Sequence, residues 1–383
     1  MGMLGLAPFC DCPAIRFWSA GPWSWCLQHR WAATSAYLSS PLVAPWFAIV
    51  NVMVGYLVIV NVLVPITYWT DVYHAKTFPI FSTKFFTRSG QLYDITAVVN
   101  NNFELDLEAY KRNGPIHLST SFAIAYGLGF AAIAATLTME KIWQRYRASL
   151  KEKPDVHTCL MRNYPDIPQW WFFLLLVVTI GITIASFESY KHQLQLPWWG
   201  VIFACAVASF FTLPIGVITA TTNQTPGLNI ITEYIMGYLL PGKPIANVCF
   251  KTYGYISMTQ AIAFLQDFKL GHYMKVPPRS MFIVQVVGTI VAGIVNTGVA
   301  WWLLSTIKNI CDKTQLPPGS PWTCPTDTIF FDASVTWGLV GPKRIFGSLR
   351  EYSKMRWFFL GGCCKADSGA PSVPCKTLRG DAP

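Results

Sequence analysis

Charge is scarce in this sequence of 383 residues: only 13% of them are Asp, Glu, Lys or Arg, while 52% are hydrophobic. A soluble domain carries about 25% charged residues. The deficit indicates that much of the protein surface faces something other than water. The net charge of +10 comes with no basic stripe and no RNA-binding motif, so nucleic acid is not an expected partner.

The motifs of common hydrolases and nucleotide-binding enzymes are absent as well. The sequence contains no HExxH, no GxSxG and no GxxxxGK[ST], the patterns of zinc proteases, serine hydrolases and P-loops. Its eleven cysteines show no zinc-binding spacing. We therefore expect neither an enzyme nor an ATP-driven pump, and no metal site or cofactor.

Long apolar runs dominate the sequence instead. At 1.5 Å per residue, 18 or more residues suffice to cross about 30 Å of hydrocarbon. Six runs reach that length, at residues 46–69, 117–139, 170–187, 198–220, 245–266 and 281–305. Two shorter runs, 228–240 and 330–340, are expected to be half-helices or re-entrant segments. We predict an all-α, polytopic transmembrane helix bundle of about six to eight spans, half-helices included.

The distribution of Lys and Arg predicts the orientation. Residues 140–169 contain six of them, whereas residues 188–197 contain only Lys191. Because cytoplasmic loops are enriched in Lys and Arg, we place the first stretch inside and the second outside. If the chain changes sides at each following span, with the short run 228–240 crossing or re-entering, residues 269–279 lie inside and residues 306–327 lie outside. Cys311 and Cys324, in that outer stretch, are candidates for a disulfide in an oxidising space.

The most informative feature is a polar insert, interrupted by Pro and Gly, between two apolar runs. Residues 219–242 read TATTNQTPGLNIITEYIMGYLLPG, with breaks at Pro226-Gly227 and Pro241-Gly242. A broken membrane helix leaves backbone groups that hydrocarbon cannot satisfy, so it persists only against protein or a water-filled cavity. In secondary transporters such breaks mark the substrate site near the midplane. The insert therefore predicts a transporter.

Two ionisable residues stand out within the apolar runs, Glu233 after the first break and Lys251 near the start of the next span. Charges inside a membrane are costly and are functional candidates by default. Glu233 is a candidate proton-binding group, and Lys251 a candidate partner for Glu233 or for a substrate carboxylate. The alternative is a static ion pair that only holds two broken elements together, or two side chains that extend to the membrane interface.

Amide and hydroxyl side chains gather at the first break. They are suited to bind peptide groups of a substrate, or to cap the half-helix that follows, as Asn and Thr often do. The free N–H groups at the start of that half-helix also favour binding of the negatively charged end of a ligand. The polar residues in question are Asn223, Gln224, Thr225 and Asn229.

Three longer stretches carry a family resemblance. NQTPGLNIITEYIMGYLLPG, CFKTYGYISMTQAIAFLQDFKLGHYMKVPPR and GTIVAGIVNTGVAWWLL closely resemble the oligopeptide transporter family of plants and fungi. The segment KVPPR at 275–279 is similar to the KIPPR signature of that family, which favours the peptide-transporter clade over the metal–chelate clade. Its residues Lys275, Pro277, Pro278 and Arg279 are expected in a cytoplasmic loop, where Lys275 and Arg279 contact headgroups or neighbouring loops.

The resemblance covers residues 32–362 and implies proton-coupled uptake of small peptides across the plasma membrane, with protons as the coupling ion. Family members are much longer, and the resemblance is to their second half only. A non-transporting fragment, or a modulator of a full-length relative, is therefore one alternative; a carrier of metal–chelate or glutathione-type cargo is another. Residues 1–31 and 363–383 do not resemble the family, and we expect both to be artefacts of the gene model. The oligomeric state is not predicted.

Overall fold

The structure is a computed structural model of the chain. It describes residues 45–100, 103–138, 156–311, 315–317, 319–324 and 336–346, together with residues 144, 147, 330, 333, 334, 352 and 353. The two terminal segments, 1–31 and 363–383, lie outside these residues, so their assignment as gene-model artefacts stays a prediction.

The described part of the chain contains four helices that are long and apolar enough to cross a membrane. They are Trp46–Trp69, Gln169–Ser189 (α8), Trp198–Thr222 (α10) and Pro278–Thr306 (α14). With almost no sheet among the described residues, they confirm the predicted all-α transmembrane class.

The first of these helices changes its winding along its length. It consists of α2 (Trp46–Val58), the π-helical turn η1 (Ile59–Leu63) and α3 (Val64–Trp69). Pro65 accounts for the widened turn, because proline has no N–H to donate and its ring clashes with the carbonyl four residues earlier.

Two of the expected spans differ from the structure. The run expected at 117–139 is helix α5, Thr120–Thr138, which begins later because His117–Leu118 forms strand β2. The run expected at 245–266 extends further and consists of α12 (Pro244–Lys251), the π-helical turn η3 (Thr252–Ile256) and α13 (Ser257–Tyr273). Lys251 therefore lies just before a wide helical turn.

The two short runs are short helices, as expected. Residues 228–240 contain helix α11 (Asn229–Leu239), and the described part of 330–340 contains the π-helical turn η4 (Thr336–Val340). Helix α16 (Pro342–Phe346) follows η4. Both η4 and α16 pack against α11, and η4 also packs against α12.

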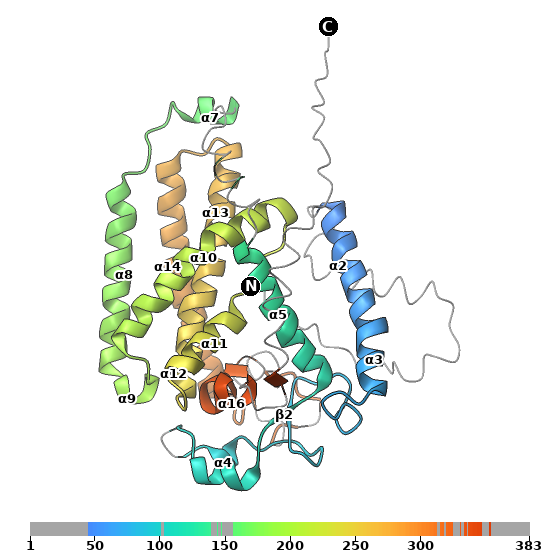
Figure 1. Ribbon diagram of the computed structural model, residues 1–383. Coiled ribbons are helices and arrows are strands. Elements are labelled where there is room, and N and C mark those ends of the chain that lie inside the picture. The colour runs from blue at the N-terminus through green and yellow to red at the C-terminus, as the bar shows by residue number, and fades with distance from the viewer. Residues whose placement is uncertain are drawn as a thin grey trace.

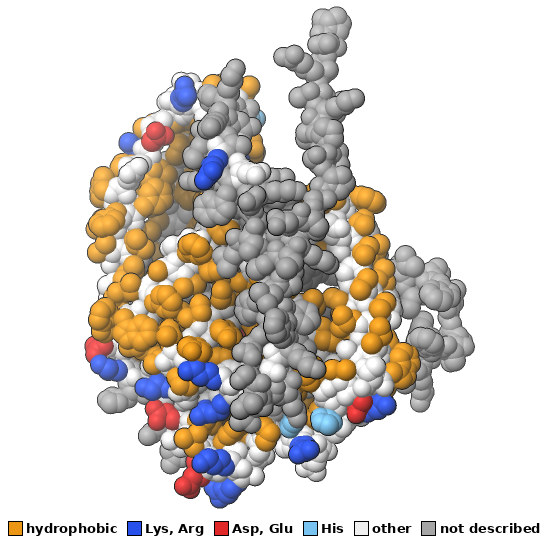
Figure 2. All heavy atoms as spheres, in the orientation of Figure 1, with side chains coloured by type: hydrophobic (Ala, Val, Ile, Leu, Met, Phe, Trp, Pro, Cys, Tyr) orange, Lys and Arg blue, Asp and Glu red, His pale blue; other side chains and the backbone are white. Residues whose placement is uncertain are grey.

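Figure 1 shows α8, α10, α13 and α14 on one side of the molecule, with contacts from α8 to α10, from α10 to α13 and from α13 to α14. Helices α2 and α3 lie on the other side, beyond α5, and α3 contacts α5. Hydrophobic side chains cover the flanks of the long helices in Figure 2, and charged ones gather toward the two ends. No residue of α14 is buried against the described part of the chain. These flanks are suited to face lipid.

A small layer of short elements closes the lower end of the bundle in Figure 1. Its elements are β1 (Phe85–Phe86), η2 (Thr96–Val98), α4 (Leu107–Asn113) and β2. The strands pair antiparallel, and the Tyr352 hydroxyl contacts both the N–H and the carbonyl of Leu118 at 2.8 and 3.0 Å. One buried core joins this layer to α5, η4 and α16. The layer thereby holds η4 against α11 and α12.

The predicted sidedness is consistent with the two ends of the bundle. At the upper end in Figure 1, α7 (Val156–Met161) contacts α13. At the lower end, α9 (Lys191–Leu194) contacts α12. The described residues 156–169 and 269–279, both predicted to be inside, thus share one end of the molecule, and the stretch 188–197 lies at the other.

Candidate substrate and proton site

The first helix break is a tight polar turn. Helix α10 ends at Thr222, and Asn223 follows in the left-handed conformation (φ 55°), which Asn tolerates better than most residues. Oγ1 of Thr219 lies 3.2 Å from the Gln224 carbonyl, just past the end of α10, and 3.2 Å from Oγ1 of Thr225. Polar side chains therefore satisfy part of the freed backbone from within the protein, as a break at membrane depth requires.

The capping interpretation of the polar residues is wrong for the half-helix. The N-cap of α11 is Leu228, and no described side chain makes a capping hydrogen bond there. Asn223 instead ends α10, with its N–H donating to the Thr219 carbonyl at 2.8 Å. The free N–H groups at the start of α11 thus remain available to another acceptor.

The second break depends on three glycines, of which Gly338 comes from a distant part of the chain. Gly242 adopts a φ of +90°, which favours glycine, and its N–H donates to the carbonyl of Gly338 at 2.8 Å. A Cβ on Gly338 would lie 2.7 Å from the Cα of Pro244, and a Cβ on Gly237 would lie 2.3 Å from the carbonyl oxygen of Trp337. The absence of these side chains lets α11, α12 and η4 approach closely.

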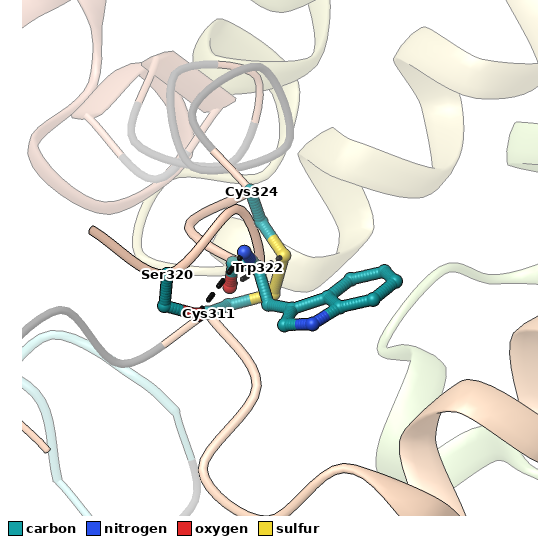
Figure 3. The surroundings of a disulfide bond; sticks show 4 residues. All are labelled: Cys311, Ser320, Trp322 and Cys324. Atoms are coloured by element: carbon teal, nitrogen blue, oxygen red, sulfur yellow. Dashed lines mark hydrogen bonds between the residues drawn. A yellow bond between two sulfur atoms is a disulfide. The ribbon is translucent and has the colours of Figure 1, made fainter. Parts of the chain in front are cut away.

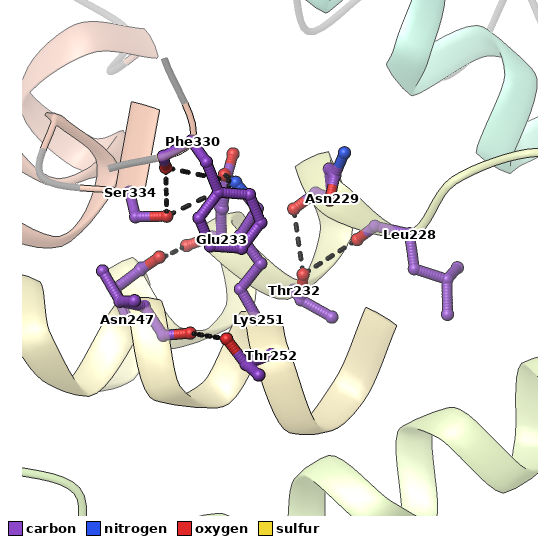
Figure 4. Close-up of polar contacts among 10 residues, drawn as sticks. Leu228, Asn229, Thr232, Glu233, Asn247, Lys251, Thr252, Phe330 and Ser334 are labelled. Carbon is purple, nitrogen blue, oxygen red and sulfur yellow. Dashed lines mark hydrogen bonds and ion pairs between the residues drawn. The ribbon is translucent and has the colours of Figure 1, made fainter. Parts of the chain in front are cut away.

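Glu233 and Lys251 face each other in the interior of this three-way contact (Figure 4). Nζ of Lys251 lies 2.5 Å from Oε1 of Glu233, and both residues are 2% exposed. The alternative in which the two side chains extend to the membrane interface is therefore wrong. Asn247, one turn before Lys251, donates from Nδ2 to the main-chain carbonyl of Glu233 at 2.9 Å, which ties α12 to α11 next to the pair.

Two residues that the sequence argument missed complete the surroundings of Lys251. Oγ of Ser334 lies 3.4 Å and the carbonyl of Phe330 3.5 Å from the Lys251 ammonium, and the centroid of the Phe330 ring lies 3.7 Å from it. An ion pair buried at this depth is stable only while both charges are present. Protonation of Glu233, or capture of Lys251 by an anion, must therefore rearrange these contacts.

The polar residues of the first break occupy a different place from the ion pair. Asn223 lines a cavity of about 400 Å³ together with Thr219, Ala220, Thr221, Gln266 and Pro45. Glu233 and Lys251 are not among the lining residues of that cavity. Gln224 and Thr225 lie in the loop after α10, and Asn229 is the first residue of α11. The structure thus has a cavity with both polar and apolar lining residues at the break, and a separate, buried charge pair between α11 and α12.

The KVPPR segment is only partly a loop. Lys275 lies in the turn after α13 with a φ of 59°, but Pro277 is the N-cap of α14 and Pro278 its first residue. The expectation that Pro278 and Arg279 belong to the loop is therefore wrong, since proline is favoured in the first helical turn. Arg279 donates from Nε to the Asp166 carbonyl at 3.0 Å, a contact with a neighbouring loop.

Cys311 and Cys324 are joined by a disulfide beyond the end of α14 (Figure 3). The N–H of Cys311 also donates to the carbonyl of Trp322 at 3.0 Å. This hydrogen bond is a second link between the two ends of the loop. The side of the membrane on which this loop lies stays a prediction.

The sequence matches a family model over most of its length, and three plant proteins are similar to it. The model, described as OPT oligopeptide transporter protein, matches residues 15–366. The chain belongs to the oligopeptide transporter family. Oligopeptide transporters 2, 4 and 7 of Arabidopsis thaliana are 60%, 59% and 58% identical to it over 339 residues. No solved structure matches the chain.

These relatives are much longer than this member of the family. The aligned region covers 87% of this chain but only 46% of oligopeptide transporters 2 and 4 and 44% of oligopeptide transporter 7. The chain therefore spans less than half the length of these relatives. With its apolar helices, family membership makes it an integral membrane protein.

Proposed function

We propose that this chain is a multi-pass carrier that moves small peptides across the plasma membrane by symport with protons. The observation that carries the proposal is the Glu233–Lys251 ion pair, buried between two broken helical elements of a membrane bundle. Its residues are among the few charges within the apolar part of the chain, and such charges commonly serve transport.

The pair is suited to couple a proton to an anion. Protonation of Glu233 removes the negative partner of Lys251 and leaves a buried cation, which is costly until another anion approaches it. A substrate carboxylate supplies that anion. Loss of the proton then restores the original pair and releases the carboxylate. One proton and one substrate charge would therefore move together.

The peptide part of the proposal rests on the family and on the cavity at the first break. The named relatives are oligopeptide transporters. The cavity presents hydroxyl and amide groups from Thr221, Asn223 and Gln266, which can hydrogen-bond peptide groups. In this proposal, the substrate peptide lies in the cavity and extends along the start of α11. The C-terminal carboxylate of the peptide then reaches Lys251. Residues 140–169 and 269–279 face the cytoplasm.

The test is uptake of labelled tetra- and pentapeptides by cells that express this chain, with and without an imposed pH gradient. Wild-type uptake should require the gradient, and Glu233→Gln should abolish it. Glu188→Gln is the matched control, because Glu188 forms an exposed ion pair with Lys191 at 2.7 Å. It should transport as the wild type does.

The other outcomes identify the alternatives. A correctly inserted chain that takes up nothing would be a non-transporting fragment or a modulator of a full-length relative. Uptake of labelled glutathione or of a metal–chelate, without uptake of peptides, would assign that cargo instead.

A further inference from the structure

We propose that Phe330 and Ser334 are positioning residues that compete with substrate for the Lys251 ammonium. The proposal rests on the proposed function of the Glu233–Lys251 pair and adds what controls access to it.

Protein atoms already occupy the surroundings of the Lys251 ammonium. An ammonium has three N–H donors, and three oxygen acceptors surround this one: Oε1 of Glu233 at 2.5 Å, Oγ of Ser334 at 3.4 Å and the Phe330 carbonyl at 3.5 Å. The Phe330 ring covers the ammonium at 3.7 Å, where the negative face of the ring attracts the cation. A substrate carboxylate can reach Lys251 only by replacing some of these contacts.

Phe330 and Ser334 act as one unit. The Ser334 hydroxyl donates to the carbonyl of Phe330, four residues earlier in the chain, at 3.0 Å. Ser334 has no exposed surface. Downstream, η4 is held against α12 by the close contact between Gly338 and Pro244. A displacement of Phe330 and Ser334 would therefore release the ring and the hydroxyl from Lys251 together.

The competition predicts a change in apparent substrate affinity that depends on the carboxylate. A cation–π contact corresponds to a change in an equilibrium constant of about 2-fold at an exposed site and about 30-fold when it is desolvated. Phe330→Leu should therefore lower the KM for a tetrapeptide with a free C-terminal carboxylate by a factor in this range. The KM for the same peptide with a C-terminal amide should not change, because an amide does not compete for the ammonium as an anion does.

The experiment measures both KM values in cells for the wild type, Phe330→Leu, Ser334→Ala and Phe330→Tyr. Ser334→Ala should act in the same direction as Phe330→Leu, and it carries the test if the leucine variant is not inserted. Phe330→Tyr keeps the ring face and should behave as the wild type. The matched control is Tyr238→Leu, which removes an exposed cation–π contact with Lys343 at 4.0 Å and should leave both KM values unchanged. A KM that stays constant or rises for the free acid, or shifts equally for acid and amide, would overturn the proposal.

A second readout does not depend on transport. In purified protein, mass spectrometry measures acylation of Lys251 by an amine-reactive ester, with exposed Lys343 as the internal reference. Phe330→Leu and Ser334→Ala should raise the labelling of Lys251 severalfold, and Phe330→Tyr should not. Unchanged labelling in the first two variants would overturn the positioning role even if peptides are transported. If the wild type transports no peptide, the proposed function fails, and this labelling alone decides whether Phe330 and Ser334 shield Lys251.

Discussion

Removing the charges of Glu233 and Lys251 one at a time and together distinguishes a static ion pair from a working proton site. The variants are Glu233→Gln, Lys251→Met and the double variant, which keep side-chain size while removing charge. Both residues are 2% exposed, so neither can turn to water when its partner is lost.

The expected magnitudes follow from burial. At the observed 2.5 Å, the Coulomb attraction is about 7 kcal/mol for an effective dielectric constant of 20. Desolvation of the two ions offsets much of this attraction. Loss of one partner leaves an unpaired buried charge and should lower the free energy of unfolding by about 3–5 kcal/mol, whereas the double variant should lie near the wild type or up to about 4 kcal/mol above it.

The assay combines reversible denaturation in detergent with peptide uptake at an imposed pH gradient. The control is the same cycle at the surface pair Glu188–Lys191, whose side chains are 52% and 61% exposed. An exposed pair contributes about 0–1 kcal/mol, so its single variants should be close to the wild type.

Uptake then decides the role of the buried pair. If Glu233 carries the coupled proton, the double variant should fold but show no uptake that depends on the gradient. A double variant that folds and retains such uptake would refute the proton site and leave a static ion pair. Single variants no less stable than those of the surface pair would refute the inferred burial cost itself.

Three further predictions concern packing, covalent closure and the loop contact. Gly237→Ala should strongly reduce the amount of folded protein that can be extracted, because its Cβ would lie 2.3 Å from the Trp337 carbonyl oxygen. Gly181→Ala is the control, because its Cβ would meet no described atom within 4 Å. In thermal denaturation it should be neutral or slightly stabilising. Cys311→Ser should lower the free energy of unfolding by about 2–4 kcal/mol, with a mass shift on alkylation that reports the freed partner thiol. Arg279→Ala should increase limited proteolysis in the loop before α8, and Arg279→Lys should restore only part of the protection, since it can still donate a hydrogen bond but without the planar guanidinium.

The sequence by itself determined the class of the protein and the positions of the helix breaks. Runs of 18 or more apolar residues have few alternatives to a membrane helix. Pro226-Gly227 and Pro241-Gly242 interrupt α-helix for local reasons, since proline lacks a donor and glycine favours turns. Glu233 and Lys251 stood out because charge is rare within such runs.

Local rules failed where a tertiary contact decided the conformation. Strand pairing with Phe85 and Phe86 keeps His117 out of α5, although the apolar run begins there. The capping preference of Asn and Thr suggested that the polar residues start α11, but Asn223 ends α10 instead.

Only the tertiary structure decided that Glu233 and Lys251 form one buried pair and what surrounds it. Ser334 lies 83 residues and Phe330 79 residues from Lys251 along the chain. No periodicity or motif links positions so far apart. Their contact arises because Gly237 and Gly338 lack side chains, which lets η4 pack directly on α11 and α12. The sequence identifies the residues that can carry charge. Close packing between segments that are distant in the chain decides which of these residues contact each other in the buried interior.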